Sequence, residues 1–201
     1  MISEAQTLIY EVDAALSSAS NSRHSEMLRG MTDLFLGGSG NFSDDQIAVF
    51  DDVIALLIKN AELPALVELS ARLAPLDNAP VKVIACLSCH DDMAVAGPVL
   101  EKSNALSDQT LIEITATKRP NHLIAIAGRA QISETVTDAL LDRGNSDVVH
   151  KVIANYGARI SEVGFVKLIG HAKTDKALAA VIAKRTDLPP ELEPFLRLTL
   201  S

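Results

Sequence analysis

Aromatic residues are scarce in this 201-residue sequence, where five Phe, two Tyr and no Trp make up only 3% of the chain. The hydrophobic fraction is nevertheless 48%, so the core must consist of Leu, Ile, Val and Ala. Strands are enriched in aromatic and β-branched residues, and this composition therefore favours helices over sheets. The scarcity also argues against base handling by a nucleic-acid enzyme, because that chemistry depends on aromatic stacking.

We also expect no membrane span, no secretory leader and no disulfide framework. No stretch of about 18 uncharged apolar residues occurs, so no membrane span is predicted. Residues Met1–Gln6 lack a basic region followed by an apolar one, and we therefore expect no signal peptide. The only cysteines are Cys86 and Cys89, three positions apart. Together these features predict a protein of the reducing cytoplasm.

Basic residues are outnumbered, because 18 Lys and Arg stand against 26 Asp and Glu and give a net charge of −8. An acidic protein repels phosphates, so a general role in DNA or RNA binding is disfavoured. The charge is unevenly distributed along the chain. Residues 1–60 carry three basic and nine acidic residues, whereas residues 118–185 carry eleven basic and six acidic ones. A locally basic surface is therefore compatible with the acidic total.

Apolar residues recur at three- and four-residue steps through the first hundred residues, which predicts a series of amphipathic helices. Ser3 with Gln6 and Ser43 with Gln46 have the spacing of a capping box at the start of a helix. Pro98 should kink or interrupt the helix in which it lies. The predicted helices cover about 3–19, 23–36, 43–60, 64–73, 80–89 and 91–102.

A degenerate repeat follows in the C-terminal half of the chain. Apolar–Ser or apolar–Pro pairs begin four helices, and their second members are Ser107, Ser133, Ser161 and Pro189, spaced by 26, 28 and 28 residues. An acidic residue follows each serine, which combines an N-cap hydroxyl with a negative charge at the helix start. A repeat of this length is typical of stacked two-helix units, because one such unit cannot bury its own apolar face.

These patterns predict an all-α fold, an α-α superhelix of HEAT-like or leucine-rich-variant type with a right-handed course. Residues 1–60 would form an N-terminal helical cap, bundle or oligomerisation segment. Residues 61–201 would form the helical-repeat array, continuous with residues 1–60 in one domain. A helical bundle without repeats is the alternative fold.

Three stretches resemble a known family: Asp91–Leu100, His122–Arg129, and Met27–Leu36 leading into Phe50–Val53. They are similar to an uncharacterised bacterial helical family, domain of unknown function 2336, over roughly residues 23–198. The resemblance implies a helical-repeat fold and a bacterial cytoplasmic protein. It implies no activity, no catalytic residue and no cofactor, and Cys86 and Cys89 are not part of the family pattern.

The segment Cys86–His90 has the C-x-x-C-H spacing at which c-type haem is attached, and its side chains could also bind zinc. Haem attachment normally requires export, and a zinc site lacks a second pair of ligands at standard spacing. Cys86 and Cys89 are therefore interpreted as residues that pack in the core at the end of an amphipathic helix.

Histidines offer two further candidate sites. His24 lies near a helix start and could accept a phosphoryl group, but no nucleotide-binding motif accompanies it, so a solvent-facing role is favoured. His122, His150 and His171 recur in the repeat region but out of register. They are interpreted as exposed or half-buried helix residues rather than metal ligands.

The sequence contains only weak candidates for catalytic motifs. The glycine-rich segment 37–40 follows a helix and lacks a G-K-[ST] sequence, so it reads as a linker rather than a phosphate-binding loop. The acidic pairs Asp44–Asp45, Asp51–Asp52 and Asp91–Asp92 point in diverging directions on a helix, which favours caps and solvated faces. No catalytic residue, metal site or cofactor is predicted.

Arg129, Arg159 and Arg185 lie after helices or in loops at related repeat positions. They could line one edge of a concave surface and bind an acidic or phosphorylated protein partner. Alternatively, they cap helix C-termini, where cations are favoured without any partner.

The predicted function is a non-enzymatic interaction or scaffold module for an unknown protein partner. Neither nucleic acid nor a membrane is an expected partner, and a homo-oligomer is compatible with the sequence. The alternative is a regulatory signalling module that oligomerises through residues 1–60. An enzyme is the third hypothesis, and no recognisable motif supports it.

Overall fold

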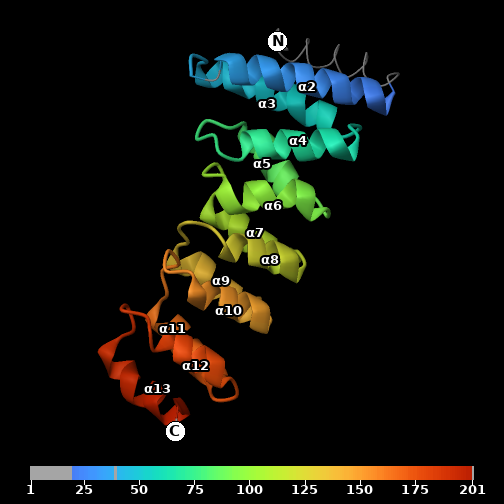
Figure 1. Ribbon diagram of the computed structural model, residues 1–201. Coiled ribbons are helices and arrows are strands. Elements are labelled where there is room, and N and C mark those ends of the chain that lie inside the picture. Colours follow the sequence, from blue (N-terminus) through green and yellow to red (C-terminus); the bar gives the residue numbers. More distant parts are fainter. Residues whose placement is uncertain (1–19, 39, 201) are drawn as a thin grey trace. The chain divides into compact units, whose positions relative to one another are not determined.

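The computed structural model describes residues 20–38 and 40–200, and they form an all-α fold, as predicted (Figure 1). These residues contain twelve α-helices and one short 3₁₀ helix, and no strand. The helix predicted at 3–19 lies outside the described residues. Within the described part of the chain, no helix combines the length and the apolar character needed to cross a membrane.

The chain divides into two compact units, Met1–Leu106 and Ser107–Ser201. The described helices of the first unit are α2 (Asn21–Gly38), α3 (Asp44–Ile58), α4 (Leu63–Leu73), α5 (Val81–Ser88) and α6 (Met93–Lys102). Those of the second unit are α7 (Asp108–Thr117), α8 (Pro120–Ala127), α9 (Glu134–Arg143), α10 (Ser146–Ala154), α11 (Glu162–Ala172), α12 (Lys176–Ile182), the 3₁₀ helix η1 (Pro190–Leu192) and α13 (Glu193–Leu200).

In the first unit the helices form two layers, with α2, α4 and α6 packed in succession and α3 packed on α5. Helices α2 and α3, from the predicted N-terminal segment 1–60, pack directly on α4 and α5, and the unit extends to Leu106. Three of the five phenylalanines cluster here. The Phe50 ring centroid lies 5.3 Å from that of Phe35 and 4.9 Å from that of Phe42.

Of the kink or interruption predicted at Pro98, the structure excludes the interruption, because α6 continues through this residue. The helix buries Val95, Ala96, Val99 and Leu100. A proline inside a helix costs about 3 kcal/mol, and the burial of four apolar side chains stabilises the helix by a comparable amount or more.

A buried carboxylate links the two layers of the first unit. Asp51 on α3 is only 6% exposed. Its two oxygens accept hydrogen bonds from the backbone amides of Lys82 at 2.9 Å and Val83 at 2.8 Å. Helix α5 has Pro80 at its N-cap position and no side-chain cap of its own, so Asp51 caps this helix from a neighbouring one. The adjacent Asp52 forms an ion pair with the Lys82 side chain.

The second unit is also built in two layers, one formed by α7, α9 and α11 and the other by α8, α10 and α12. Helix α13 packs on α11 and α12. Ser107, Ser133 and Ser161 accept hydrogen bonds from the amides of Thr110, Val136 and Gly164, which confirms the three predicted N-caps. Pro189 differs, because the 3₁₀ helix η1 comes before α13 at this point.

Polar contacts connect successive helix pairs of the second unit. The Asn155 side chain donates to the carbonyl oxygens of Ala127 at 3.0 Å and Arg129 at 2.7 Å, one helix pair earlier. The backbone of Ile132 forms an isolated parallel bridge with the segment at Ala158. Gly157 allows this close approach, because a Cβ atom there would lie 1.9 Å from the Ala130 carbonyl oxygen.

Replacing Asp51 with Ala should lower the free energy of unfolding by about 1–3 kcal/mol, since two amides at a buried helix start lose their acceptor. Asp52→Ala is the matched control, because it removes only a partly exposed ion pair and should cost less than about 1 kcal/mol. Urea denaturation followed by circular dichroism measures both. Equal losses for the two variants would contradict the cap.

Candidate functional site

The three arginines predicted to line one edge occupy different environments. The Arg159 side chain is 78% exposed and pairs with Glu134 at 3.1 Å. Arg129 and Arg185 are buried, with 8% and 6% of their surface exposed. Burial lowers the pKa of the Arg129 guanidinium, and the Asp108 carboxylate opposes this effect. Arg129 and Arg185 therefore offer a partner little surface, and a shared binding edge remains an untested prediction.

Arg185 caps the preceding helix pair, in agreement with the alternative interpretation of these residues. Its Nη1 donates to the carbonyl oxygens of Ile153 at 3.3 Å and Asn155 at 2.9 Å, and its Nη2 donates to that of Ala158 at 2.9 Å. Asp187 accepts two further hydrogen bonds from the guanidinium, and this contact holds the pKa of Asp187 below its usual value. The side chain thus closes the C-terminal end of α10.

The two thiols are exposed, so the prediction that they pack in the core is wrong. Helix α5 buries Val83, Ile84 and Leu87, and steps of about 100° per residue turn Cys86 away from this face. Desolvation and the neighbouring Cys89 raise the pKa of Cys86, with Lys59 acting in the opposite direction. In the described part of the chain, no three His, Cys, Asp or Glu residues are placed to hold a metal ion.

The histidines are dispersed. His24 is 2% exposed, so its predicted solvent-facing position is wrong; its Nδ1 lies 2.9 Å from the Ser20 carbonyl oxygen at the start of α2. His122 is buried, and His171 is exposed. His150 is half-buried, and its Nε2 lies 2.7 Å from an Asp175 carboxylate oxygen. The pKa of Asp175 is lowered mainly by the hydrogen bond from the Leu178 amide and then by this contact with His150. These side chains do not form a common site.

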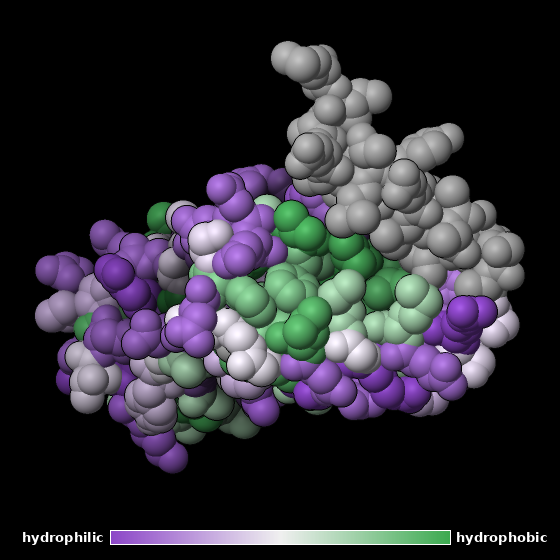
Figure 2. Space-filling view, turned by 90° about the horizontal axis from the view of Figure 1, so that it is seen from above, coloured by the Kyte–Doolittle hydropathy of each residue, from purple (hydrophilic) through white to green (hydrophobic). Residues whose placement is uncertain are grey.

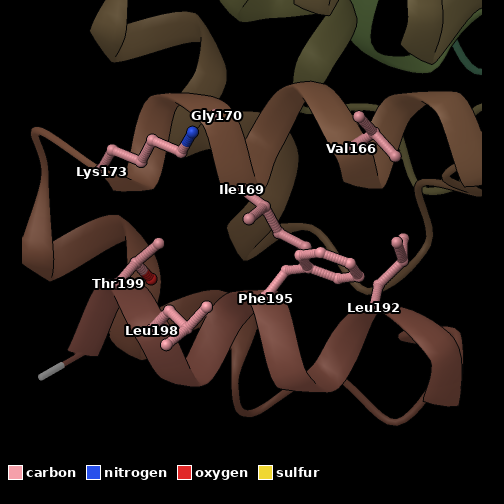
Figure 3. Close-up of a pocket in the computed structure, with 8 residues that line it drawn as sticks. All are labelled: Val166, Ile169, Gly170, Lys173, Leu192, Phe195, Leu198 and Thr199. Atoms are coloured by element: carbon pink, nitrogen blue, oxygen red, sulfur yellow. The ribbon is translucent and has the colours of Figure 1, made fainter.

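An open groove between α11 and α13, with a volume of about 670 Å³, is large enough to receive another molecule (Figure 3). Its lining is mainly apolar. It consists of Val166, Ile169 and Gly170 from α11, Lys173 at the C-cap of α11, Leu192 from η1, and Phe195, Leu198 and Thr199 from α13. Figure 3 shows the Phe195 ring reaching from α13 toward Ile169.

Several large apolar side chains of this groove are exposed to solvent: Val166 at 53%, Phe195 at 58% and Leu198 at 75%. Isolated exposed apolar residues are common, but several that line one groove indicate a contact surface. Lys173 supplies the charge in the lining and has no ion pair with a described residue. The groove can therefore bind an apolar surface with a negative charge near one end.

Sequence reasoning did not find this groove. The one available indication was the last helix, where Phe195, Leu196 and Leu198 follow one another within four residues. One helix face cannot bury all three, and the structure buries Leu196 while exposing the other two. The periodicity indicated a helix, but it could not tell which apolar residues would remain uncovered.

The fold defines an all-α protein in which each unit consists of helices packed in two layers. Residues 95–193 match the family described as an uncharacterised protein conserved in bacteria, DUF2336. The match confirms the resemblance seen in the sequence, over a shorter range than the 23–198 predicted. No curated protein matched the chain, and no solved structure matched it.

Arg185→Gln should lower the free energy of unfolding by about 2–4 kcal/mol, because three carbonyl oxygens lose a charged donor in a buried place. Arg159→Gln is the matched control and should cost less than about 0.5 kcal/mol, since its ion pair is exposed. Thermal and urea denaturation measure both variants. Unchanged stability of Arg185→Gln would return Arg185 to the group of candidate partner-binding residues.

Proposed function

We propose that this protein is a non-enzymatic interaction module whose α11–α13 groove binds the apolar face of an amphipathic helix from a protein partner. The proposal depends on one observation, the open 670 Å³ groove with exposed Val166, Phe195 and Leu198. Burial of such side chains is the main favourable contribution to helix-in-groove recognition.

The spacing of the lining residues supports a helical ligand. Val166, Ile169, Gly170 and Lys173 stand at positions i, i+3, i+4 and i+7 of α11, so they follow one side of that helix over two turns. Phe195 and Leu198 form the facing wall from α13. A Cβ atom on Gly170 would meet nothing within 4 Å, so the floor of the groove is open at that residue.

The positive charge of Lys173 favours a ligand that carries an acidic residue at this end of the groove. A lysine at the rim of an apolar contact contributes mainly to orientation and to the association rate rather than to affinity. The surplus of basic residues at 118–185 acts in the same direction. We therefore propose an amphipathic helix with two or three large apolar side chains and a carboxylate near the Lys173 end.

Two further features belong to this proposal. The stacked helix pairs within each unit support a HEAT-like repeat array, the class of fold that presents long surfaces to partners. Cytoplasmic location is supported by the two free, exposed thiols at Cys86 and Cys89, which are compatible with a reducing compartment.

Photo-crosslinking in the cell that makes the protein tests the groove. A photoreactive amino acid at position 166 should form a covalent adduct with one partner protein, and mass spectrometry should place the adduct on an amphipathic helix. Val163 is the matched control position, because it is on the same helix, is 60% exposed and does not line the groove.

Phe195→Ala should abolish most of the adduct at position 166, because loss of a central aromatic side chain costs about 2 kcal/mol, or about 30-fold in Kd. Circular dichroism checks that the variant remains folded. Equal crosslinking at positions 163 and 166, or an adduct with nucleic acid or lipid, would refute the proposal.

A further inference from the structure

The first unit carries a second apolar groove, between α2 and α3, with a volume of about 420 Å³. Figure 2, seen from the α2–α3 end of Figure 1, shows apolar side chains gathered on this face. The described residues that line the groove are all apolar or glycine: Met27, Gly30, Met31 and Leu34 from α2, and Val49, Phe50, Val53 and Leu57 from α3. We refer to them as the α2–α3 face.

The α2–α3 face has the pattern of a helix-pairing surface. Met27, Met31 and Leu34 recur at steps of four and three residues along α2. Met27 and Leu34 are 43% and 61% exposed, and Val49 on α3 is 39% exposed. Apolar residues with this spacing form the seam by which helices pack on other helices.

Gly30 lies near the middle of the 18-residue helix α2, and the described contacts do not explain why it is a glycine. It is exposed, and a Cβ atom there would meet nothing within 4 Å. Glycine inside a helix costs about 1 kcal/mol relative to alanine. A glycine at the centre of an apolar face does allow another backbone to approach closely.

The charges differ in sign between the two ends of α3. Asp44 and Asp45 lie in its first turn, and Lys59 follows its last residue. The acidic start of α3 in one copy is therefore complementary in charge to the basic end of α3 in another copy. A second copy in the reversed direction would bring opposite charges together, whereas a copy in the same direction would bring like charges together.

We propose that the α2–α3 face binds the same face of a second copy of this chain. The two-fold axis would run perpendicular to the helices and pass near Gly30. The α2 helices of the two copies would then cross antiparallel at their glycines, and Lys59 of each copy would approach the acidic start of the other copy's α3. The product is a four-helix bundle with a self-complementary interface.

This inference is independent of the proposed function, because the two grooves are in different units and share no residue. Substitutions in one groove should leave the behaviour of the other unchanged. The experiments below therefore test self-association alone.

Sedimentation equilibrium of the full-length protein tests the dimer. The wild-type protein should be a dimer in reversible exchange with monomer, and Leu34→Lys should weaken association at least about tenfold, since a lysine replaces an apolar residue of the seam. Val163→Lys is the matched control, with 60% exposure against 61% for Leu34, and should dimerise as the wild type does. Circular dichroism checks that both variants are folded.

Cysteine crosslinking tests the orientation in a full-length background with Cys86→Ser and Cys89→Ser. Gly30→Cys should form a disulfide between two copies under mild oxidation, because the proposed axis places each Gly30 beside the other. Gly37→Cys is the matched control. It is equally unobstructed, but the axis places the two copies of Gly37 at opposite ends of the bundle.

Three results would overturn the proposal. A monomer at all concentrations, unaffected by Leu34→Lys, would mean that another occupant covers the face, whether residues 1–19 of the same chain or a different protein. A dimer that Leu34→Lys leaves intact would place the interface elsewhere. Crosslinking of Gly37→Cys in preference to Gly30→Cys would contradict the axis.

Discussion

A short helix pair cannot bury its own apolar face, and this constraint determines most of the architecture. The α-helices of the second unit are 7–11 residues long, below the length at which isolated helices are stable in water. Each pair is stabilised by the next, through the two layers that alternate helices form. The aliphatic core follows from this arrangement, because Leu, Ile, Val and Ala fill the space between closely packed helices.

Polar contacts determine how successive helices meet. Asp51, Asn155 and Arg185 each form hydrogen bonds with the backbone of another helix pair. Asp51 accepts from two amides, Asn155 donates to two carbonyl oxygens, and Arg185 donates to three. Such contacts are directional, whereas apolar burial is not, so they fix the position of each helix pair against the preceding one. The same requirement places Gly157 where no Cβ atom would fit.

The two grooves follow from the same constraint. In each unit one helix pair, α2–α3 or α11–α13, has an apolar side that is exposed to solvent. Both grooves contain an exposed glycine in a helix interior, Gly30 and Gly170, at which a Cβ atom would meet nothing. The proposed ligands differ because the surroundings differ: α3 carries charge of both signs at its ends, whereas Lys173 lines the α11–α13 groove.

The sequence by itself determined the all-α class, most helix positions and the three serine caps, because these depend on residues within four positions of one another. It did not determine that Arg185 is buried, that Cys86 is exposed, that His24 is covered or that α6 continues through Pro98. Each of these depends on which helix lies opposite, and the packing of separate helices decides that. The grooves depend on it in the same way, since periodicity shows that a face is apolar and only tertiary packing decides whether that face is covered.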